Sequence, residues 1–556
     1  MEIARERQLD WLLGEVLGGN APAQRPARLS RPRLMAALIV LGAGVAFGVA
    51  ALRERDGGGG NGVVAPVDAP QDPAAPIPWV ECHGDAALGK VPEDVTALHC
   101  FDFTDAGLAG LGRFTKLTHL DLSGTDVDNR GWSKVLVITD AGVEKLATLT
   151  GLRWLSLAQC HDVQGTTLGA LRAIPQLEHL DLTYTGLRSE GIAQLPQLPS
   201  LRELALSSCM DFHGRSLADV AKLPGLRRLE LRGCATLQAD DVKQLAALHE
   251  LRHLDLRDCM GAFRGQTMSF DDITNGEPPA KPTQDAIGVT DEAIAALVGL
   301  PLETLLLDGC RSLTDGVADS LGKLKTLRAV GLGELPKISA TTLLALPAQL
   351  RELSLRGDRQ LLGKWYAVVA QLTALERLDL SGMTNLDDAG LAHILESCPL
   401  RELDLSGEEP SAGAGPAAPL RPRLTADKTA AALARVRTLE RLGLRYADGF
   451  DAGIATNLAQ LPRLTSLDLQ MVPIDRAAWS ALGGSHSLRE LRLVWARGVD
   501  VPALDELGQV PLQDLDLYGC RDLRLKDMGL FESWPGVRVR LPNGARYVEP
   551  ARPTPK

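Results

Sequence analysis

Leucines recur along this chain at intervals of 24 or 25 residues, and each recurrence opens the same nine-residue phrase. Leu152, Leu177, Leu201, Leu226 and Leu251 begin five consecutive copies. The phrase is L-x-x-L-x-L-x-x-C/T, and its first, fourth and sixth positions are leucine in every copy except for Val330. Fifteen copies are present in all, the others beginning at Leu117, Leu302, Leu327, Leu350, Leu375, Leu400, Leu439, Leu464, Leu488 and Leu512.

The spacing inside the phrase predicts a short β-strand. Positions 4 and 6 lie two residues apart, so their side chains point to one side of the strand and into a core. Positions 3, 5 and 7 face the other way, toward solvent. One such unit cannot enclose a core by itself, so stacked copies must bury the leucines in a quasi-one-dimensional solenoid.

The rest of each period predicts a turn and a short helix. Residues 139–146 and 290–297 begin with Thr139-Asp and Thr290-Asp, a threonine cap followed by an acidic first turn. Apolar residues then recur at three- and four-residue spacing, as in Val143, Leu146 and Ala147. We expect parallel strands to line a concave face and the helices to cover a convex one.

The ninth position of the phrase predicts a ladder of buried thiols. Because a ladder supplies one sulfur per repeat, it favours a side chain that bonds the backbone of the turn over a metal site, which needs converging ligands. The ladder cysteines are Cys160, Cys209, Cys234, Cys259, Cys310 and Cys520.

The T-D-x-G helix start and the terminal cysteine resemble the cysteine-containing subtype of leucine-rich repeat, over roughly residues 95–541. That resemblance implies an α/β horseshoe with concave strands and convex helices. Similar repeats occur in substrate-binding subunits of cullin-type ubiquitin ligases and in bacterial surface proteins. No F-box-like segment precedes the repeats here, which departs from the ligase adaptors.

Residues 34–52 (LMAALIVLGAGVAFGVAAL) are nineteen uncharged residues, long enough to span a bilayer as a helix. A cleavable signal peptide, with a weak site near Gly48-Val-Ala50, is the alternative. The arginines that precede the span predict a cytoplasmic N-terminus and extracytoplasmic repeats, and they are Arg25, Arg28, Arg31 and Arg33. We therefore expect a single-pass protein of the bacterial inner membrane, with its repeats in the periplasm.

The segments on either side of the span have their own patterns. Within the cytoplasmic leader (1–33), apolar residues between Leu9 and Leu17 form one stripe of a helix that either lies on the membrane or docks a cytoplasmic partner. This leader and span resemble N-termini of membrane proteins from planctomycete-like bacteria. A Gly/Pro-rich linker follows at 53–78.

The sequence then predicts an N-terminal cap with a first degenerate repeat (79–116), the repeats proper (117–541) and a C-terminal tail (542–556). An exported location permits disulfides, and Cys82 and Cys100, which flank the expected cap, are the candidate pair.

The composition and the motifs of the chain limit the classes of ligand and chemistry that we expect. The net charge of −11 argues against a nucleic-acid ligand, which favours a basic surface. No phosphate-binding loop, zinc-protease motif, C-x-x-C pair or hydrolase elbow is present, so we expect no cofactor, no resident metal and no catalytic residues.

Three His-x-Asp pairs at positions 3 and 5 are the strongest candidates for chemistry. They are His119 with Asp121, His179 with Asp181, and His253 with Asp255. Because they lie at least two repeats apart, about 10 Å at strand spacing, they cannot share one ion. We interpret them as a polar or ligand-contact lining, with an envelope hydrolase as the remote alternative. The same lining includes Trp154, Arg228 and Glu230.

A column of aspartates continues this lining through Asp379, Asp404, Asp468 and Asp516. Asp379 and Asp404 should be direct neighbours, where like charges repel unless a cation intervenes. Arg377 and Arg441 are the expected cations, with a basic ligand or calcium as alternatives.

Three insertions interrupt the period, near residues 126–137, 260–288 and 408–424. Insertions in solenoids collect on one rim, so Trp132, Phe263 and Phe270 are candidate anchors for a partner. The alternative is that these rings fold back over their own loops.

The sequence therefore favours a membrane-tethered recognition scaffold that binds a protein, peptide or envelope polymer on its concave face. An adaptor in a degradation or signalling complex is the second hypothesis, and it requires repeats that face the cytoplasm.

Overall fold

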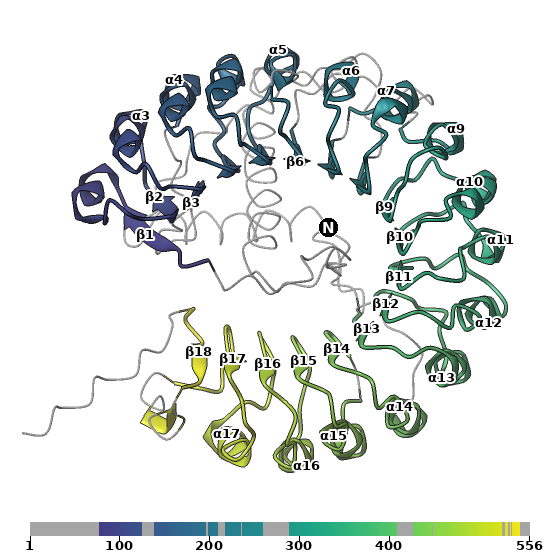
Figure 1. Ribbon diagram of the computed structural model, residues 1–556. Helices are drawn as coiled ribbons and strands as arrows, with labels where there is room; N and C mark the ends of the chain where they lie inside the picture. The colour runs from purple at the N-terminus through teal and green to yellow at the C-terminus, as the bar shows by residue number, and fades with distance from the viewer. Residues whose placement is uncertain are drawn as a thin grey trace, which may run out of the picture. The chain divides into compact units, whose positions relative to one another are not determined.

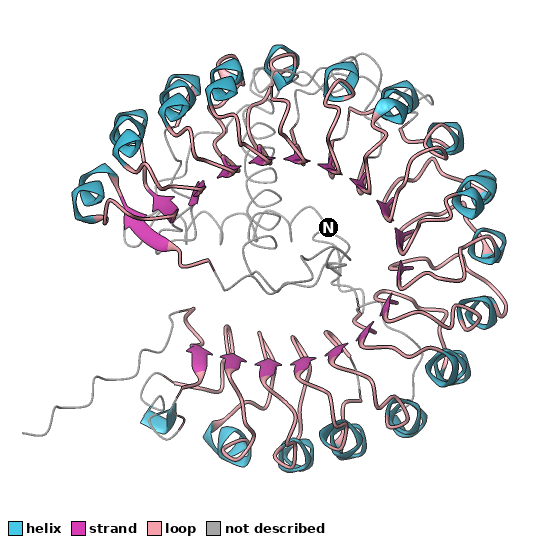
Figure 2. Cartoon of the chain, in the orientation of Figure 1, coloured by secondary structure: helices cyan, strands magenta, loops and turns pink. Residues whose placement is uncertain are grey.

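The computed structural model describes residues 77–124, 138–195, 198–209, 217–234, 236–259, 288–407, 426–447, 449–524, 529–531, 534 and 536–544. All of them belong to one compact unit. Within it, helices and strands alternate along the chain, with the strands on the inner side and the helices on the outer side (Figures 1 and 2).

The described strands form a single open sheet in which every pairing is parallel and joins neighbours in sequence, from β1–β2 to β17–β18. The predicted positions 4 pair with one another, as Leu378 does with Leu353 and Leu403. The strands are β1 Val80–His83, β2 Ala97–Phe101, β3 His119–Gly124, β4 Trp154–Ser156, β5 His179–Asp181, β6 Glu203–Ala205, β7 Arg228–Glu230, β8 His253–Asp255, β9 Thr304–Leu306, β10 Ala329–Gly331, β11 Glu352–Ser354, β12 Arg377–Asp379, β13 Glu402–Asp404, β14 Arg441–Gly443, β15 Ser466–Asp468, β16 Glu490–Arg492, β17 Asp514–Asp516 and β18 Arg538–Arg540.

Short helices return the chain from each strand to the next. The α-helices are α3 Asp105–Leu108, α4 Asp140–Lys145, α5 Ser189–Ile192, α6 Leu217–Val220, α7 Ala239–Gln244, α9 Asp291–Ala295, α10 Ala318–Lys323, α11 Ala340–Leu344, α12 Trp365–Val369, α13 Asp388–Ser397, α14 Ala426–Leu433, α15 Ala452–Ala459, α16 Arg476–Leu482 and α17 Val501–Glu506. The 3₁₀ turns are η1 Asp85–Lys90, η2 Ala109–Arg113, η3 Leu146–Thr148, η4 Leu168–Ala173, η7 Leu245–Ala247 and η8 Asp315–Val317.

The leucines of the phrase form one continuous core between the sheet and the helices. Leu152, Leu155 and Leu157, at positions 1, 4 and 6 of one copy, are fully buried, and the other copies repeat this burial. Each side chain packs against its equivalents in the neighbouring copies. The predicted solenoid core is therefore present throughout the described repeats.

The six ladder cysteines bond the backbone between copies. All six are buried free thiols, and each donates to the carbonyl of position 6 in the preceding copy, as Cys259 does to Leu231 at 3.0 Å and Cys520 to Leu493 at 3.0 Å. Burial raises the pKa of the Cys160 thiol to about 12, so this thiol stays neutral and unreactive at physiological pH.

A second ladder on the helical side explains the T-D-x-G motif. The Thr139 amide and hydroxyl donate to the Asp105 carboxylate at 2.9 and 2.6 Å, and Asp105 begins the helix of the preceding repeat. A Cβ on Gly142 would lie 2.1 Å from Asp105 Oδ1. Only glycine leaves room for the carboxylate at this position. The same bonds join Thr104 to Asp85, Thr314 to Asp291 and Ser339 to Asp315.

The helix starts differ between the two halves. Thr139 caps α4 as the sequence predicts, since its hydroxyl accepts from Ala141 N, but Thr290 makes no such bond at the start of α9. In the C-terminal half the helices are capped by aspartates from within their own repeat, as Asp451 caps α15. These self-capped helices do not need a neighbour's carboxylate.

Cys82 and Cys100 do not form the expected disulfide in the structure. Both are buried free thiols on β1 and β2, where they lie opposite each other in register. Leu98 pairs with Leu120, at position 4 of the next copy, and the two cysteines lie in the same buried cluster as the spine leucines. Burial raises the pKa of both thiols.

Several predicted features lie outside the described residues. They are the leader helix, the span at 34–52, the linker up to residue 76, and the rim candidates Trp132, Phe263 and Phe270 with most of their insertions. Among the described residues, none of the helices combines the length and apolarity that crossing a bilayer requires.

The Thr–Asp ladder makes a testable prediction about glycine. Gly142→Ala should lower the free energy of unfolding by about 1–3 kcal/mol, because the new methyl group displaces the Asp105 carboxylate. Urea unfolding followed by tryptophan fluorescence measures this change. Gly299→Ala is the control, since its Cβ would meet no atom within 4 Å. Equal stabilities of the two variants would contradict the prediction.

Candidate functional site

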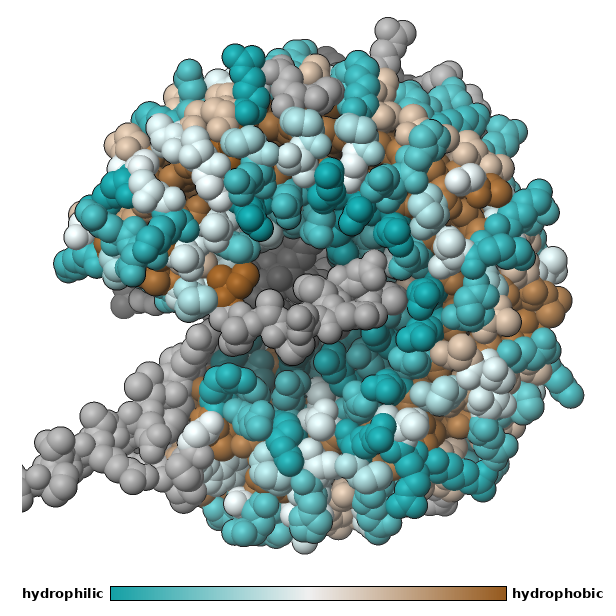
Figure 3. All heavy atoms as spheres, in the orientation of Figure 1, coloured by the Kyte–Doolittle hydropathy of each residue, from teal (hydrophilic) through white to brown (hydrophobic). Residues whose placement is uncertain are grey.

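The inner face of the sheet is formed by positions 3, 5 and 7 of each repeat. In-register pairing aligns each position with its equivalents on both neighbouring strands, as in Arg377 opposite Glu402 and Asp379 opposite Asp404. Three rows of side chains therefore run across the strands. Figure 3 shows hydrophilic residues gathered along this inner side, in contrast to the apolar core behind it.

From β11 to β14, the position-3 row alternates in charge. Arg377 bonds Glu352 on one side and lies 3.5 Å from Glu402 on the other, and Arg441 contacts the same Glu402 at 3.6 Å. Burial raises the pKa of the Glu352 carboxyl to about 7, against the opposing effect of Arg377. This row neutralises itself.

The aspartate column of position 5 is present, but its predicted counter-ions are wrong. Asp379 and Asp404 are direct neighbours, yet Arg377 and Arg441 are engaged in their own row. Arg445, at position 7, instead reaches Asp404 at 3.5 Å and Asp468 at 3.9 Å. A position-7 side chain lies two residues beyond position 5 on the same face, so a long arginine spans the gap between repeats.

Asp516 is paired differently, because its partner lies directly opposite it on the next strand. Arg540 on β18 contacts Asp516 at 3.4 Å and also covers the ring of Tyr518 at 4.6 Å. The predicted acidic column is thus largely balanced by arginines of the protein itself.

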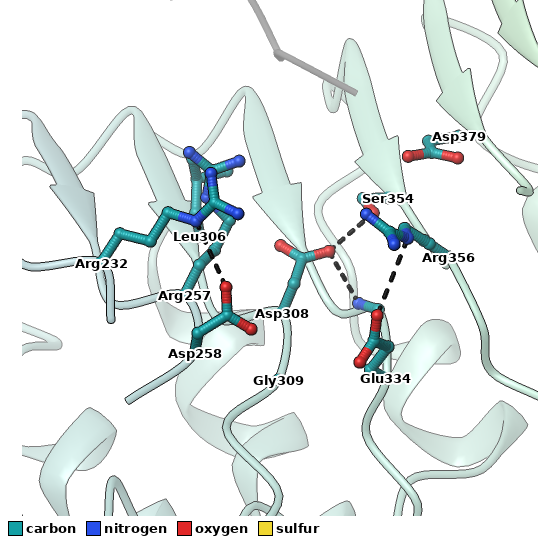
Figure 4. Close-up of a pocket in the computed structure, with 11 residues that line it drawn as sticks. Arg232, Arg257, Asp258, Leu306, Asp308, Gly309, Glu334, Ser354, Arg356 and Asp379 are labelled. Atoms are coloured by element: carbon teal, nitrogen blue, oxygen red, sulfur yellow. Dashed lines mark hydrogen bonds and ion pairs between the residues drawn. The ribbon is translucent and has the colours of Figure 1, made fainter. Parts of the chain in front are cut away.

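A hollow opens in the inner face where the side chains are small. Gly331 and Gly333 occupy positions 5 and 7 of one repeat, and the Asp308 side chain leans over them (Figure 4). Asp308 accepts hydrogen bonds from Gly333 N at 3.0 Å and Ser354 Oγ at 2.6 Å. A Cβ at Gly331 would lie 1.9 Å from its carboxylate. Glycine is therefore required beside Asp308.

The hollow is polar and mixed in charge. Arg257 approaches it from one side, held by Asp255 at 2.6 Å, and Arg356 approaches from the other, 3.7 Å from Glu334 (Figure 4). Burial raises the pKa of Asp308. The sequence analysis missed Asp308, because its role depends on the two glycines of the next repeat.

The three His-x-Asp pairs do not converge. They lie on β3, β5 and β8, and at least one strand separates each pair from the next. Burial lowers the pKa of His253 to about 3, which leaves it neutral, and Asp255 serves Arg257 instead. Among the described residues, no group of three or more His, Cys, Asp or Glu side chains is arranged to hold a metal ion.

The N-terminal repeats carry rings instead of ion pairs. Trp154 stacks on His179, with ring centroids 5.0 Å apart and planes 10° apart, and on His119 at 6.4 Å and 29°. Trp79, just before β1, contacts His119 and Trp154 edge to face at 6.1 and 5.7 Å. The sequence analysis named Trp154, His119 and His179 but missed Trp79, which precedes the first recognisable phrase.

The aromatic and imidazole rings of position 3 give way to charged side chains at Glu203 on β6 and Arg228 on β7. His179 Nδ1 lies 2.9 Å from Glu203, and this hydrogen bond lowers the pKa of the Glu203 carboxyl. Arg228 itself pairs with Glu230 at 2.7 Å. The inner face thus has two chemically distinct parts that meet between β6 and β7.

The Asp379–Asp404 pair makes a prediction about pH. Burial and the Asp404 charge raise the pKa of Asp379 to about 6 from an ordinary value of 3.8, so folding penalises its ionised form. As pH rises from about 4 to 6, Asp379 ionises and the folded protein loses stability. The uncharged side chain of Asp379→Asn should restore that stability. We expect a gain of about 1–3 kcal/mol at pH 7.5 that vanishes near pH 4.

Urea unfolding of the full chain at the two pH values measures this gain. Asp516→Asn is the control, because Asp516 is paired with Arg540 and its loss should stabilise the protein at neither pH. A gain of the same size at both pH values would contradict the electrostatic explanation.

The chain is similar to one family model and to several solved structures. The family model described as "Leucine Rich repeat" matches residues 115–135. A search of curated proteins finds no match. Among solved structures, the yeast Rad7–Elc1 complex is 18% identical, with 78% of this chain and 88% of that chain covered and a TM-score of 0.44.

Two bacterial structures give similar values. A leucine-rich repeat protein of Leptospira interrogans is 17% identical, covering 82% of this chain and 97% of that one at a TM-score of 0.39. An internalin of Listeria monocytogenes is also 17% identical, covering 68% and 82% at a TM-score of 0.32. The repeated phrase and the open parallel sheet built from it form a leucine-rich repeat solenoid, and the leucine-rich repeat family model matches one copy of the phrase.

Proposed function

We propose that this chain is a membrane-tethered, non-catalytic scaffold that binds another protein on the inner face of its sheet. The observation that carries the proposal is the set of three side-chain rows that crosses the described parallel strands. These rows form a large polar surface. Some of its side chains are well exposed, such as those of Arg441 (62%) and Arg538 (80%). Such surfaces suit extended contacts better than an enclosed reaction, although fold alone does not determine function.

The absence of convergent chemistry among the described residues supports a non-catalytic role. The candidate histidines stand on separate strands, and the ladder cysteines are buried and neutral at physiological pH. The aspartates of the column are bonded to arginines or to backbone amides, as Asp379 is to Ser381 N at 2.8 Å. These groups hold the repeats together.

The proposed tether is the apolar stretch 34–52, with four arginines before it. By the positive-inside rule the N-terminus would stay in the cytoplasm and the repeats would face the periplasm. The alternative role, an adaptor in a cytoplasmic degradation or signalling complex, needs the opposite orientation.

The binding surface is tested by charge reversal on the two sides of one repeat. Arg441→Glu changes the inner face, and Arg435→Glu changes an equally exposed arginine that follows helix α14 on the outer side. Capture of partners by the full chain, after cross-linking in its membrane and mass spectrometry, should fall several-fold for Arg441→Glu alone. Equal capture by wild type and both variants would contradict inner-face binding.

Orientation is tested by fusing reporters after Lys556. We expect active alkaline phosphatase and dark green fluorescent protein, because the former folds only in the periplasm and the latter only in the cytoplasm. Replacing two leucines of the stretch 34–52 by lysines should release the chain from the membrane fraction. A fluorescent fusion without phosphatase activity would support the cytoplasmic adaptor instead.

A further inference from the structure

The inner face of β1–β6, together with Trp79, differs in charge from the rest of the sheet. Its positions 3, 5 and 7 hold no lysine and no arginine. They hold four carboxylates, those of Glu81, Asp121, Asp181 and Glu203. We call this surface the ring face. When its imidazoles are neutral, the ring face carries four negative charges and no arginine or lysine at positions 3, 5 and 7.

From β7 onward the pattern is the opposite. Nine inner-face arginines there form ion pairs with carboxylates of the protein, namely Arg228, Arg232, Arg257, Arg356, Arg377, Arg441, Arg445, Arg538 and Arg540. On the ring face the partners of three carboxylates are imidazoles, as His179 is for Glu203 at 2.9 Å and His99 is for Asp121 at 3.6 Å. Among the described residues, the rows of the ring face therefore hold no arginine of their own, and the nearest one in the sheet is Arg228, opposite Glu203 on β7.

The ring geometry leaves one aromatic side chain partly open. Trp154 stacks with His179 and His119, and Trp79 makes an edge-to-face contact with it. Trp79 stands 74° to Trp154 and 77° to His119, so both of these contacts are edge to face. Trp79 is 40% exposed, so part of its side chain is open to the solvent.

Ala97 makes this arrangement possible. It lies opposite His119 in the position-3 row and is fully buried, so no large side chain separates Trp79 from His119. Position 2 of the phrase places Arg153 and Arg202 beside the row and outside it. The rings and carboxylates thus line the inner face at positions that hold no arginine or lysine.

We propose that the ring face binds a basic, extended segment of a partner protein, whose lysine or arginine side chains lie over Trp79 and pair with Asp181 and Glu203. Indole faces attract cations, and carboxylates in rows that hold no arginine or lysine add to the attraction. An acidic or nucleic-acid ligand would be repelled by the same charges. This inference rests on the proposed inner-face binding and names the chemistry of its partner.

The test uses the purified full chain and a fluorescein-labelled peptide of alternating lysine and glycine. Fluorescence anisotropy should show binding that weakens with added salt, and no binding of the matching glutamate–glycine peptide. Trp79→Ala should weaken binding about five-fold, and Asp181→Asn with Glu203→Gln about ten-fold. Trp154→Phe, which keeps a ring in the row, should retain most of the affinity.

The controls lie at the other end of the sheet. Trp495→Ala removes a tryptophan of similar exposure (39%), and Asp516→Asn removes an inner-face carboxylate that Arg540 already balances. Both should bind the lysine peptide as wild type does. Equal weakening by these variants would show attraction to the net negative charge alone and would overturn the proposal. Chitotetraose binding that needs Trp79, with no binding of the lysine peptide, would overturn it in favour of a glycan.

The failures of the two proposals are distinguishable. If Arg441→Glu reduces partner capture but the lysine peptide does not bind, inner-face binding stands and the basic ligand is wrong. If the peptide binds the ring face but no inner-face variant changes partner capture, the ring face is a peptide site and the scaffold proposal fails.

Discussion

The structure depends on one constraint, the in-register parallel pairing of strands that carry the same phrase. Because the described strands pair in register, apart from a shift between His99 and Phe101 in the β2–β3 pairing, each position of the phrase becomes a row that crosses the sheet. Leucines at positions 4 and 6 then form one apolar spine, and each repeat is buried by its neighbours. A residue type that recurs at one position of adjacent repeats must therefore pack beside an identical side chain.

That repetition creates a problem for polar side chains, since identical charges come to lie side by side. The protein solves it in three ways. Threonine and aspartate stand side by side at several helix starts, so that the aspartate of one repeat meets the threonine of the next, as Asp105 meets Thr139. Arginines at position 7 cross between aspartates, as Arg445 does. In the first repeats, rings and imidazoles replace charges at position 3.

These solutions divide the inner face into two parts with different uses. From β7 onward, arginines and carboxylates form ion pairs with each other and mainly hold neighbouring repeats together. Where these pairs are exposed, they add only modestly to the free energy of unfolding. The ring face at β1–β6 retains carboxylates and an exposed tryptophan. A binding partner gains the most electrostatic attraction from surface charges that are not already paired within the protein.

The amino-acid sequence by itself determined the solenoid, its strand positions, the buried leucines and the cysteine ladder, because these follow from a short period and from which side of a strand each residue faces. It also placed Asp379 beside Asp404, since both occupy position 5 of adjacent copies. Tertiary structure decided which partner each polar side chain chose. Arg445 rather than Arg377 neutralises the column, and Trp79 joins rings three strands away, because long side chains reach across repeats in directions that one-dimensional spacing does not specify.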